Sequence, residues 1–174
     1  MLDKYYKTSY FSRAGKILLI ANEDENLISL CFNEQKPINK KDIISKAVEN
    51  ENLGIFIAVK KWLDRYFSGD NPVIDEIDLK LSGTEFQKEV WNILKEIPFG
   101  KTMTYGEIAK LIEKFFGRKN MSAQAVGNAV SRNPILIIIP CHRVIGADGS
   151  LVGYSGGIEI KRKLLEFEKL ELRI

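Results

Sequence analysis

The sequence predicts a two-part chain, with a small α/β first half and a mainly helical second half. Alternating apolar residues on both sides of a polar loop within residues 16–32 are typical of a β-hairpin, and a helical apolar pattern follows at 54–67. After Ser82, three segments each open with a helix-capping residue and continue with helical spacing. We therefore place the domain boundary there, between residues 1–82 and 83–174.

The first half has the features of a support domain. Its hairpin carries Cys31 beside apolar neighbours, which favours a structural role for that thiol. The sequence also predicts a basic connector at 36–41, a short helix within 42–49 and an extended crossover at 73–81. None of these segments holds a catalytic constellation.

The second half contains sequence signals for the starts and ends of several helices. Thr84 and Thr104 each open a capping box, and Ser122 caps a third helix. Gly117 closes the second helix, so a tight polar turn joins the second and third helices, as in a helix-turn-helix. The first of these helices should bury a stripe made of Phe86, Val90, Ile93, Leu94 and Ile97.

The third helix, at 123–130, consists largely of alanine, glycine and short polar residues. Small side chains permit the close approach of another surface. That surface is either a neighbouring helix in a tightly packed core or a nucleic-acid groove, with the narrow minor groove as the favoured one.

One stretch organises the second half. Five branched aliphatic residues at 135–139 stop at Pro140 and predict a buried strand, or a buried extended segment, that leads to Cys141 and His142. Cysteine reacts as a thiolate, and a base or cation lowers the thiol pKa from its free value of about 8.5. His142 and Arg143 are both candidates for this effect. The pair is also compatible with a small core cysteine and a core histidine.

Charge is distributed unevenly along the chain. There are 26 Lys and Arg against 23 Asp and Glu, and the basic excess lies in the second half. Seven basic residues against two acidic ones lie within 101–143, around the Cys-His pair. This fits either a polyanionic partner or a solvated basic face. Two cysteines 110 positions apart and a single histidine argue against a disulfide framework and a Cys/His zinc site.

Three further segments follow the Cys-His pair. They are a turn at 146–149, a glycine-rich loop at 153–157 and a charged final helix at 161–173. A carboxylate at the far nitrogen of His142 would fix its tautomer. Glu168, on the final helix, is one of ten acidic residues in this half that could supply it.

Several motifs across 83–168 together resemble the O6-alkylguanine-DNA alkyltransferases, also called methylated-DNA–protein-cysteine methyltransferases. The resemblance implies a ribonuclease-H-like α/β first domain and a mainly helical, winged-helix-like second domain. The motifs that carry it are Gly83-Thr84-Glu85-Phe86-Gln87, Ile97-Pro98-Phe99-Gly100, Thr104-Tyr105-Gly106-Glu107-Ile108-Ala109, Ala125-Val126-Gly127-Asn128-Ala129, Pro140-Cys141-His142-Arg143-Val144 and Tyr154-Ser155-Gly156-Gly157.

The resemblance also implies roles for individual residues. Cys141 would accept the alkyl group, His142 would deprotonate it through a bound water, and Glu168 would orient His142. Asn133 would organise the turn next to the site, and Tyr105 would assist departure of the guanine. The substrate pocket would be lined by Val144, Tyr154, Ser155 and Gly156.

On the same resemblance, the helix at 122–132 would enter the minor groove of double-stranded DNA that contains O6-alkylguanine, and the base would be flipped out of the stack. The family often has an arginine that fills the gap left by the base, where this chain has Gln124. A neutral amide can still bond to the orphaned pyrimidine, but it lacks the charge. The expected DNA contacts are Ser122, Gln124, Ala125, Gly127, Asn128 and Arg132.

The sequence shows no nucleotide-binding loop or metal cluster, so we expect no cofactor, with the alkyl group supplied by the DNA. No apolar run approaches the roughly 18 residues of a membrane span, and the N-terminus has no signal-peptide core. We expect a cytoplasmic monomer without a membrane partner, and leave cooperative DNA binding open. Two alternatives remain: a non-catalytic binder of alkylated bases, and a cysteine hydrolase, whose nucleophile and base usually come from separate parts of the chain.

Overall fold

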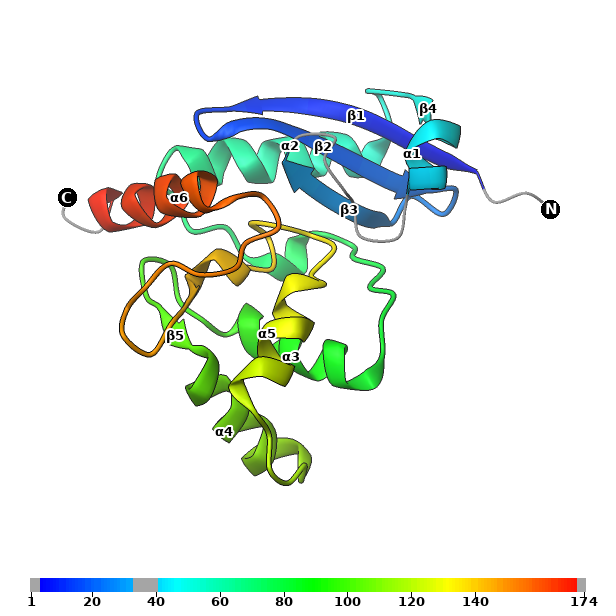
Figure 1. The fold of residues 1–174 in the computed structure, drawn as a ribbon. Helices are drawn as coiled ribbons and strands as arrows, with labels where there is room; N and C mark the ends of the chain where they lie inside the picture. Colours follow the sequence, from blue (N-terminus) through cyan, green and yellow to red (C-terminus); the bar gives the residue numbers. More distant parts are fainter. Residues whose placement is uncertain (1–3, 33–40, 172–174) are drawn as a thin grey trace. The chain divides into compact units, whose positions relative to one another are not determined.

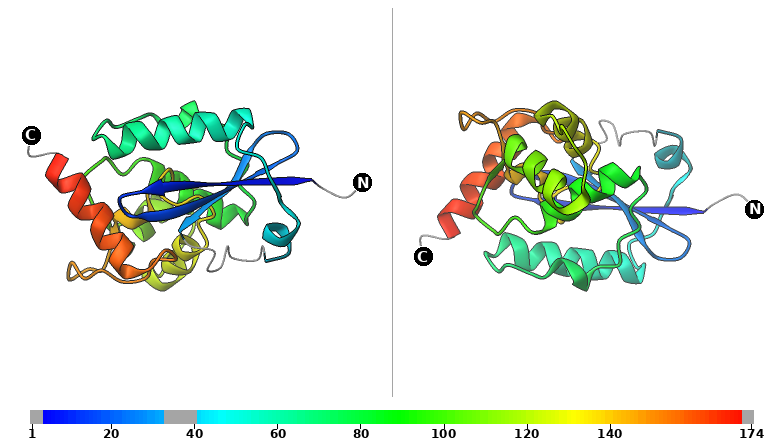
Figure 2. Two further views of the ribbon diagram at one scale, coloured as in Figure 1. Left: turned by 90° about the horizontal axis from the view of Figure 1, so that it is seen from above. Right: turned by 90° about the horizontal axis from the view of Figure 1, so that it is seen from below.

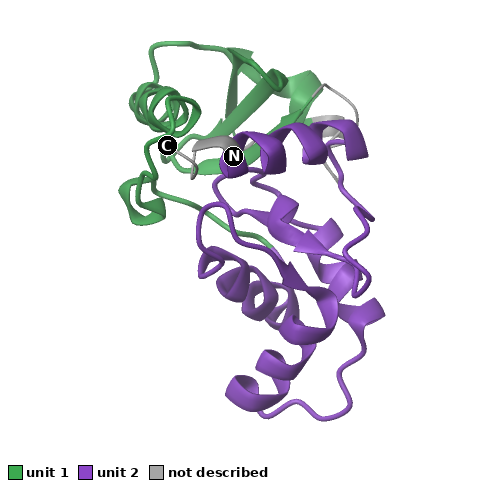
Figure 3. Ribbon diagram, turned by 90° about the vertical axis from the view of Figure 1, so that its left-hand side faces the viewer, with its two compact units in different colours: residues 1–82 green, residues 83–174 purple. Residues whose placement is uncertain are grey.

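The computed structural model describes residues 4–32 and 41–171. The chain forms two compact units, Met1–Ser82 and Gly83–Ile174 (Figure 3). Most of the predicted basic connector, 36–40, and the last residues of the predicted final helix, 172–173, lie outside the described residues.

A four-stranded sheet forms the centre of the first unit (Figure 1). Its second and third strands make the predicted hairpin, in which Cys31 is buried among apolar side chains. The first strand was not predicted, because its apolar and polar residues do not alternate cleanly. In the order β3-β2-β1-β4, the strands are β3 (Leu27–Phe32), β2 (Gly15–Asn22), β1 (Tyr5–Ser12) and β4 (Val48–Glu49).

The helices α2 (Gly54–Phe67) and α1 (Lys41–Lys46) lie on opposite faces of this sheet (Figure 2). On one face, Tyr10 of β1 donates a 2.7 Å hydrogen bond to Asp64 of α2. On the other, Lys7 Nζ donates to the carbonyl of Ile44 in α1 at 3.1 Å. Neighbouring residues of a strand point to opposite faces of the sheet. Tyr10 and Lys7 are three residues apart, so their side chains contact helices on opposite faces.

Two predictions for the first unit were only partly correct. The helix predicted within 42–49 ends at Lys46, and Val48–Glu49 instead pairs in parallel with β1. The segment 73–81 contains a single 3-10 turn, Ile74–Glu76, before its extended end pairs through Leu79 with Leu27. The first difference arises because sheet pairing, a tertiary contact, overrides the local pattern. The turn in 73–81 is held by Glu76, which accepts from Val73 N–H at 3.3 Å and from Arg65 Nη1 at 2.7 Å.

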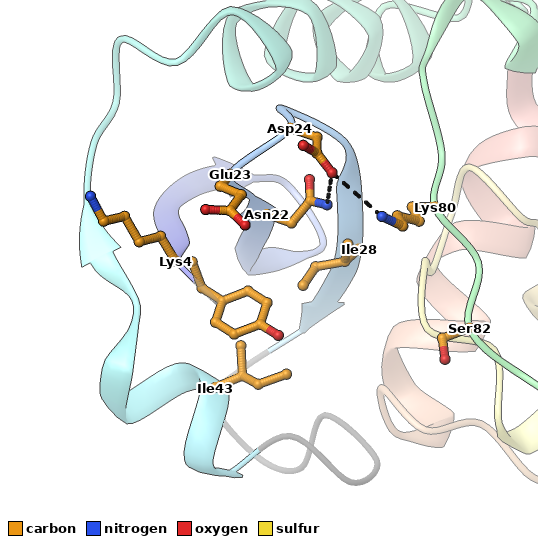
Figure 4. A pocket seen from close by; sticks show the side chains of 9 residues that line it. Lys4, Asn22, Glu23, Asp24, Ile28, Ile43, Lys80 and Ser82 are labelled. Carbon is orange, nitrogen blue, oxygen red and sulfur yellow. Dashed lines mark hydrogen bonds and ion pairs between the residues drawn. The ribbon is translucent and has the colours of Figure 1, made fainter. Parts of the chain in front are cut away.

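The first unit also has a hollow of about 320 Å³ (Figure 4). Three of its polar groups bond to one another, since Asp24 accepts from Asn22 at 3.2 Å and pairs with Lys80 at 3.5 Å. It contains neither a thiol nor an imidazole. Its lining residues are Lys4, Tyr5, Asn22, Glu23, Asp24, Ile28, Ile43, Lys80 and Ser82.

Four helices form most of the second unit (Figure 1). The three predicted N-caps are confirmed, since Thr84, Thr104 and Ser122 each accept a hydrogen bond from the backbone N–H three residues on. The last helix begins at Ile158, earlier than predicted. The helices are α3 (Glu85–Lys95), α4 (Tyr105–Phe116), α5 (Ala123–Ser131) and α6 (Ile158–Glu171).

The small residues of α5 have a packing role on one side of the helix. Ala129 and Val130 are buried, and Trp91 of α3 donates from Nε1 to the Ala129 carbonyl at 2.9 Å. Trp91 is almost completely buried, although the predicted α3 stripe omitted it, while Phe86 of that stripe is only half-buried. Tight packing against a helix therefore explains one face of α5, and its other face is open to solvent.

Residues 135–139 are buried, as predicted, but they form neither the strand nor the extended segment that the sequence predicts. The segment folds into turns. Ile138 N–H donates to the Leu136 carbonyl at 2.8 Å around Ile137, whose φ is +68°, and Cys141 N–H donates to the Ile139 carbonyl at 2.8 Å around Pro140. A hydrogen bond from the N–H of one residue to the carbonyl two residues earlier defines a γ-turn. The form in which the central residue has a positive φ is strained. A side chain elsewhere must therefore hold this backbone in place.

Candidate active site

Asn133 is the side chain that holds the turn. Its Nδ2 donates to the Ile139 carbonyl at 2.8 Å and lies 3.0 Å from Sγ of Cys141, and its Oδ1 accepts from Ile135 N–H at 3.0 Å. The side chain is buried, so each of these bonds forms away from competing water. One amide therefore fixes both the strained turn and the thiol.

A second group of buried polar residues surrounds Glu168. His142 Nε2 lies 2.7 Å from Glu168 Oε1, and Arg143 donates to the same carboxylate from Nε and Nη2 at 2.9–3.2 Å. Gly100 N–H donates to Oε2 at 2.8 Å. A carboxylate can only accept, so Nε2 of His142 carries the proton and Nδ1 is left as the acceptor. That Nδ1 is buried and makes no hydrogen bond to the described residues.

The charge states follow from this arrangement. Burial acts to raise the pKa of the Glu168 carboxyl, but His142 and Arg143 outweigh it and lower that pKa to about 2. Burial lowers the pKa of His142 below its usual value, and the attraction of Glu168 offsets this only in part. At neutral pH the pair is therefore a carboxylate and a neutral imidazole.

The thiol is protonated at rest. Burial raises the pKa of Cys141 to about 11, against the opposing effects of the Asn133 amide and the charge of Lys161. Arg143, which the sequence offered with His142 as a candidate for lowering this pKa, has other partners. Its guanidinium faces Glu168, the Ile97 carbonyl at 2.6 Å and the ring of Phe99, because a buried Arg needs these partners to offset desolvation.

Lys161 is the cation near the thiol, and sequence reasoning missed it. Its side chain is fully buried, and Nζ donates to the carbonyl of Val152 at 2.7 Å. Burial lowers its pKa to about 8, while the interaction with Cys141 acts in the opposite direction. A signal was present in the sequence: Lys161 lies at helical spacing from Leu164, Leu165 and Glu168, on the buried face of α6.

The loop before α6 encloses the thiol from another side. Tyr105, at the start of α4, donates from its hydroxyl to the Val152 carbonyl at 3.1 Å. Burial, followed by the interaction with Cys141, raises the pKa of Tyr105. Tyr154 is half-buried as a residue, but its hydroxyl is buried and makes no hydrogen bond to the described residues. Val144 is fully buried, Ser155 is exposed and Gly156 is half-buried.

The residues predicted to contact DNA share the open face of α5 and its two caps. Ser122 and Gln124 are exposed at the start of the helix, and Asn128 and Arg132 are exposed further along. Ala125 and Gly127 are half-buried. The structure therefore presents a row of short polar side chains that ends in an arginine.

Both units match known families. Residues 5–81 match the 6-O-methylguanine DNA methyltransferase ribonuclease-like domain, and residues 85–170 match the DNA binding domain of the same proteins. The chain belongs to the 6-O-methylguanine DNA methyltransferase family. The predicted family and fold class, with a ribonuclease-like first domain, are thereby confirmed.

Relatives in this methyltransferase family cover nearly the whole chain. The methylated-DNA–protein-cysteine methyltransferase of Methanosarcina acetivorans is 47% identical over 165 residues, which are 94% of this chain and 97% of that protein. The crystal structure of Mycobacterium tuberculosis O6-methylguanine methyltransferase is 40% identical, with a TM-score of 0.81, and covers 96% of this chain and 94% of that one. A crystal structure of M. tuberculosis OGT in complex with DNA gives a TM-score of 0.78 at 40% identity, over 97% and 94% of the two chains.

Two further observations concern the predicted absences. Among the described residues, no group of His, Cys, Asp and Glu could hold a metal ion. Within residues 4–32 and 41–171, no helix has the length and apolarity needed to cross a membrane.

Proposed function

We propose that this methyltransferase repairs duplex DNA by direct reversal, moving the alkyl group of O6-alkylguanine to Sγ of its own Cys141. One observation carries the proposal: the thiol is held by Asn133 next to the His142–Glu168 pair, inside the unit that matches a DNA binding domain. The match of both units to 6-O-methylguanine DNA methyltransferase domains disfavours the alternative of a cysteine hydrolase.

The base must leave the duplex before it can meet a buried thiol. Extrusion costs a few kcal/mol, and less for a weakened or mispaired base, which contributes selectivity for the lesion. In this proposal α5 enters the minor groove, and its short side chains allow the close approach that a wide helix face would prevent. Gln124, exposed at the start of α5, bonds to the pyrimidine left unpaired.

The transfer itself is a single displacement. Nδ1 of His142 takes the thiol proton through a water molecule, and Glu168 stabilises the imidazolium that forms. The sulfur attacks the alkyl carbon in line, so that an S–C bond forms as the C–O6 bond breaks. The electron pair of the broken bond goes to the guanine, which gains a proton at N1 and is restored.

The other residues of the site hold the base or stabilise the charge on the sulfur and on the departing guanine. Val144, Tyr154, Ser155 and Gly156 line the pocket in this proposal, and Tyr105 donates a hydrogen bond that assists departure of the guanine. Lys161 acts through the thiol, because its charge stabilises the thiolate. No step calls for a cofactor, since the DNA supplies the alkyl group.

Each molecule acts once, because the S–C bond of the thioether is very stable and the thiolate is a poor leaving group from it. We therefore expect one alkyl group per chain and no turnover. The protein acts as a monomer. It works in the compartment that holds the DNA, which in a cell without a nucleus is the cytoplasm.

Mass spectrometry tests this directly. After incubation with a duplex that contains one O6-methylguanine, the peptide that holds Cys141 should gain the mass of one CH₂ group and saturate at one per chain. Cys141→Ala should bind the same duplex and gain nothing. Tight binding by the wild type without a mass gain would instead identify a non-catalytic lesion binder, and methyl transfer by Cys141→Ala would show that the nucleophile is misassigned.

A further inference from the structure

The last turn of α4 extends beyond the core that the rest of the helix covers (Figure 1). Ile108, Ala109 and Ile112 are buried, and Phe115 and Phe116 continue the same stripe at helical spacing. Yet Phe115 is 63% exposed and Phe116 is 42% exposed. We call residues 113–119 the α4 overhang.

Hydrogen bonds tie the overhang to the neighbouring helices. Glu113 accepts a 2.9 Å hydrogen bond from Met121 N–H, which ties the connection to α5 back onto α4. Arg118 donates to both carboxylate oxygens of Glu89 on α3, at 2.6 and 3.1 Å. These bonds keep the overhang next to Ser122, the cap of α5. A surface that is ordered before binding loses little entropy when it binds.

The exposed charges of the overhang are mostly cationic. Glu89 neutralises Arg118, whereas Glu113 keeps its negative charge because its partner is a backbone N–H. Lys114 and Lys119 outnumber Glu113, with Lys110 one turn earlier, and Lys114 Nζ lies 5.1 Å from the centroid of the Phe115 ring. Exposed phenylalanines between lysines fit a partner with anionic and apolar groups close together. Duplex DNA has this chemistry, with phosphates outside and sugar and base edges in the groove.

We propose that the α4 overhang is a second DNA contact, continuous with α5, which grips the duplex beside the lesion. Lys114 and Lys119 neutralise phosphates, and Phe115 and Phe116 lie against the sugar and base edges of the groove. The four helical steps from Ile112 to Phe116 advance by about 6 Å at helical rise. This length corresponds to about two base-pair steps of duplex. The proposal rests on DNA as the partner of this unit.

Self-association is a poorer explanation of the same surface. A symmetric dimer through the overhang would place its lysines against the same lysines of the second copy. Two phenylalanines also offer far less than the roughly 1,000 Å² that a stable protein interface needs. DNA binding removes both difficulties, because the phosphates complement the lysines and α5 supplies most of the contact.

The test compares matched variants by their affinity for a duplex that contains O6-methylguanine. Phe115→Gln/Phe116→Gln should weaken binding roughly tenfold, because apolar burial is lost. Its log–log salt slope should stay unchanged, since no charge is removed. Phe11→Gln, at a phenylalanine that is 78% exposed in the first unit, is the control and should bind as the wild type does. The melting temperature of each variant should stay close to that of the wild type, because Phe11 and Phe115 are largely exposed and Phe116 is about half exposed.

The lysines give an independent measurement. Lys114→Gln/Lys119→Gln should bind more weakly and reduce the magnitude of the salt slope by about 1.8, since two phosphate contacts are lost. Lys61→Gln, an exposed lysine on α2, should leave the slope unchanged. Benzoylphenylalanine in place of Phe115 should crosslink to the duplex under light, and in place of Phe11 it should not.

The outcomes separate this proposal from the proposed function. If the wild type does not bind the duplex, DNA repair itself is wrong. If the wild type and both overhang variants bind equally, and position 115 does not crosslink, only the overhang proposal fails. Loss of self-association in Phe115→Gln/Phe116→Gln, with DNA affinity intact, would assign the surface to a second copy and would also overturn it.

Discussion

Around Cys141 the second unit buries polar side chains, whereas along α5 it exposes them. Asn133, His142, Arg143, Lys161 and Glu168 are all nearly or fully buried, while Ser122, Gln124, Asn128 and Arg132 face solvent. A buried polar group must find partners at fixed distances, so these residues define one geometry. Exposed groups are satisfied by water and can exchange it for phosphate. The buried site should therefore be intolerant of change and the α5 face tolerant.

The largest effect should come from Glu168→Gln. This change leaves the buried Arg143 without its counter-charge, and breaking such a pair costs about 3–5 kcal/mol of stability. Glu166→Gln, at an exposed acid on the same helix, is the control and should change stability by less than about 0.5 kcal/mol. Denaturant unfolding of both variants measures this. Equal stability would mean that the buried network is not a structural unit.

The same comparison predicts a pH dependence. The folded pKa of Glu168 is about 2, below the unfolded value of about 4.3. The folding stability that ionised Glu168 contributes is therefore fully present above pH 4.3 and is lost as the pH falls toward 2. The stability gap between wild type and Glu168→Gln should narrow across that window, and a constant gap would contradict the ionised pairing.

A matched pair of glycine variants should reveal the strain in the turn around Ile137. Ile137→Gly and Ile138→Gly lose the same buried side chain, and they change the unfolded chain equally. Glycine tolerates the φ of +68° at position 137, so Ile137→Gly should be less destabilised by about 1–3 kcal/mol. Denaturant midpoints test this. Equal losses would mean that Asn133 holds no strain in the turn.

Lys161→Met should affect the chemistry more than the fold. The two side chains have similar volume, but the charge that stabilises the thiolate is gone. The thiol pKa should rise, and alkyl transfer at neutral pH should slow by roughly tenfold, as for a pKa rise of about one unit. The pH–rate profile should move to higher pH, whereas Lys163→Met, at an exposed lysine on α6, should keep the wild-type profile. An unmoved profile would remove Lys161 from the mechanism.

The smallest effect is expected from a change on the exposed face of α5. Arg132→Gln should keep wild-type stability and single-use transfer, and should weaken DNA binding. The magnitude of the log–log salt slope should fall by about 0.9, the value for one phosphate contact. Binding measured at several salt concentrations gives the slope. A flat salt response in the wild type would contradict a basic DNA-binding face altogether.

Local signals in the sequence determined much of this protein. The caps at Thr84, Thr104 and Ser122, the apolar periods of the helices and the β2–β3 hairpin are properties of a few neighbouring residues, so they could be predicted from spacing alone. Cys141 and His142 are adjacent in the chain, which made the proposed reactive pair visible without a structure.

Only the tertiary structure decided how that pair is surrounded. The run at 135–139 has the composition of a strand, but the amide of Asn133 holds it in strained turns. Arg143 faces Glu168 rather than the thiol, and the cation beside the thiol is Lys161 from a distant helix. Burial keeps the thiol and the imidazole neutral, whereas His142 and Arg143 keep Glu168 ionised. These are contacts between residues far apart in sequence, and local pattern carries no information about which of them will form.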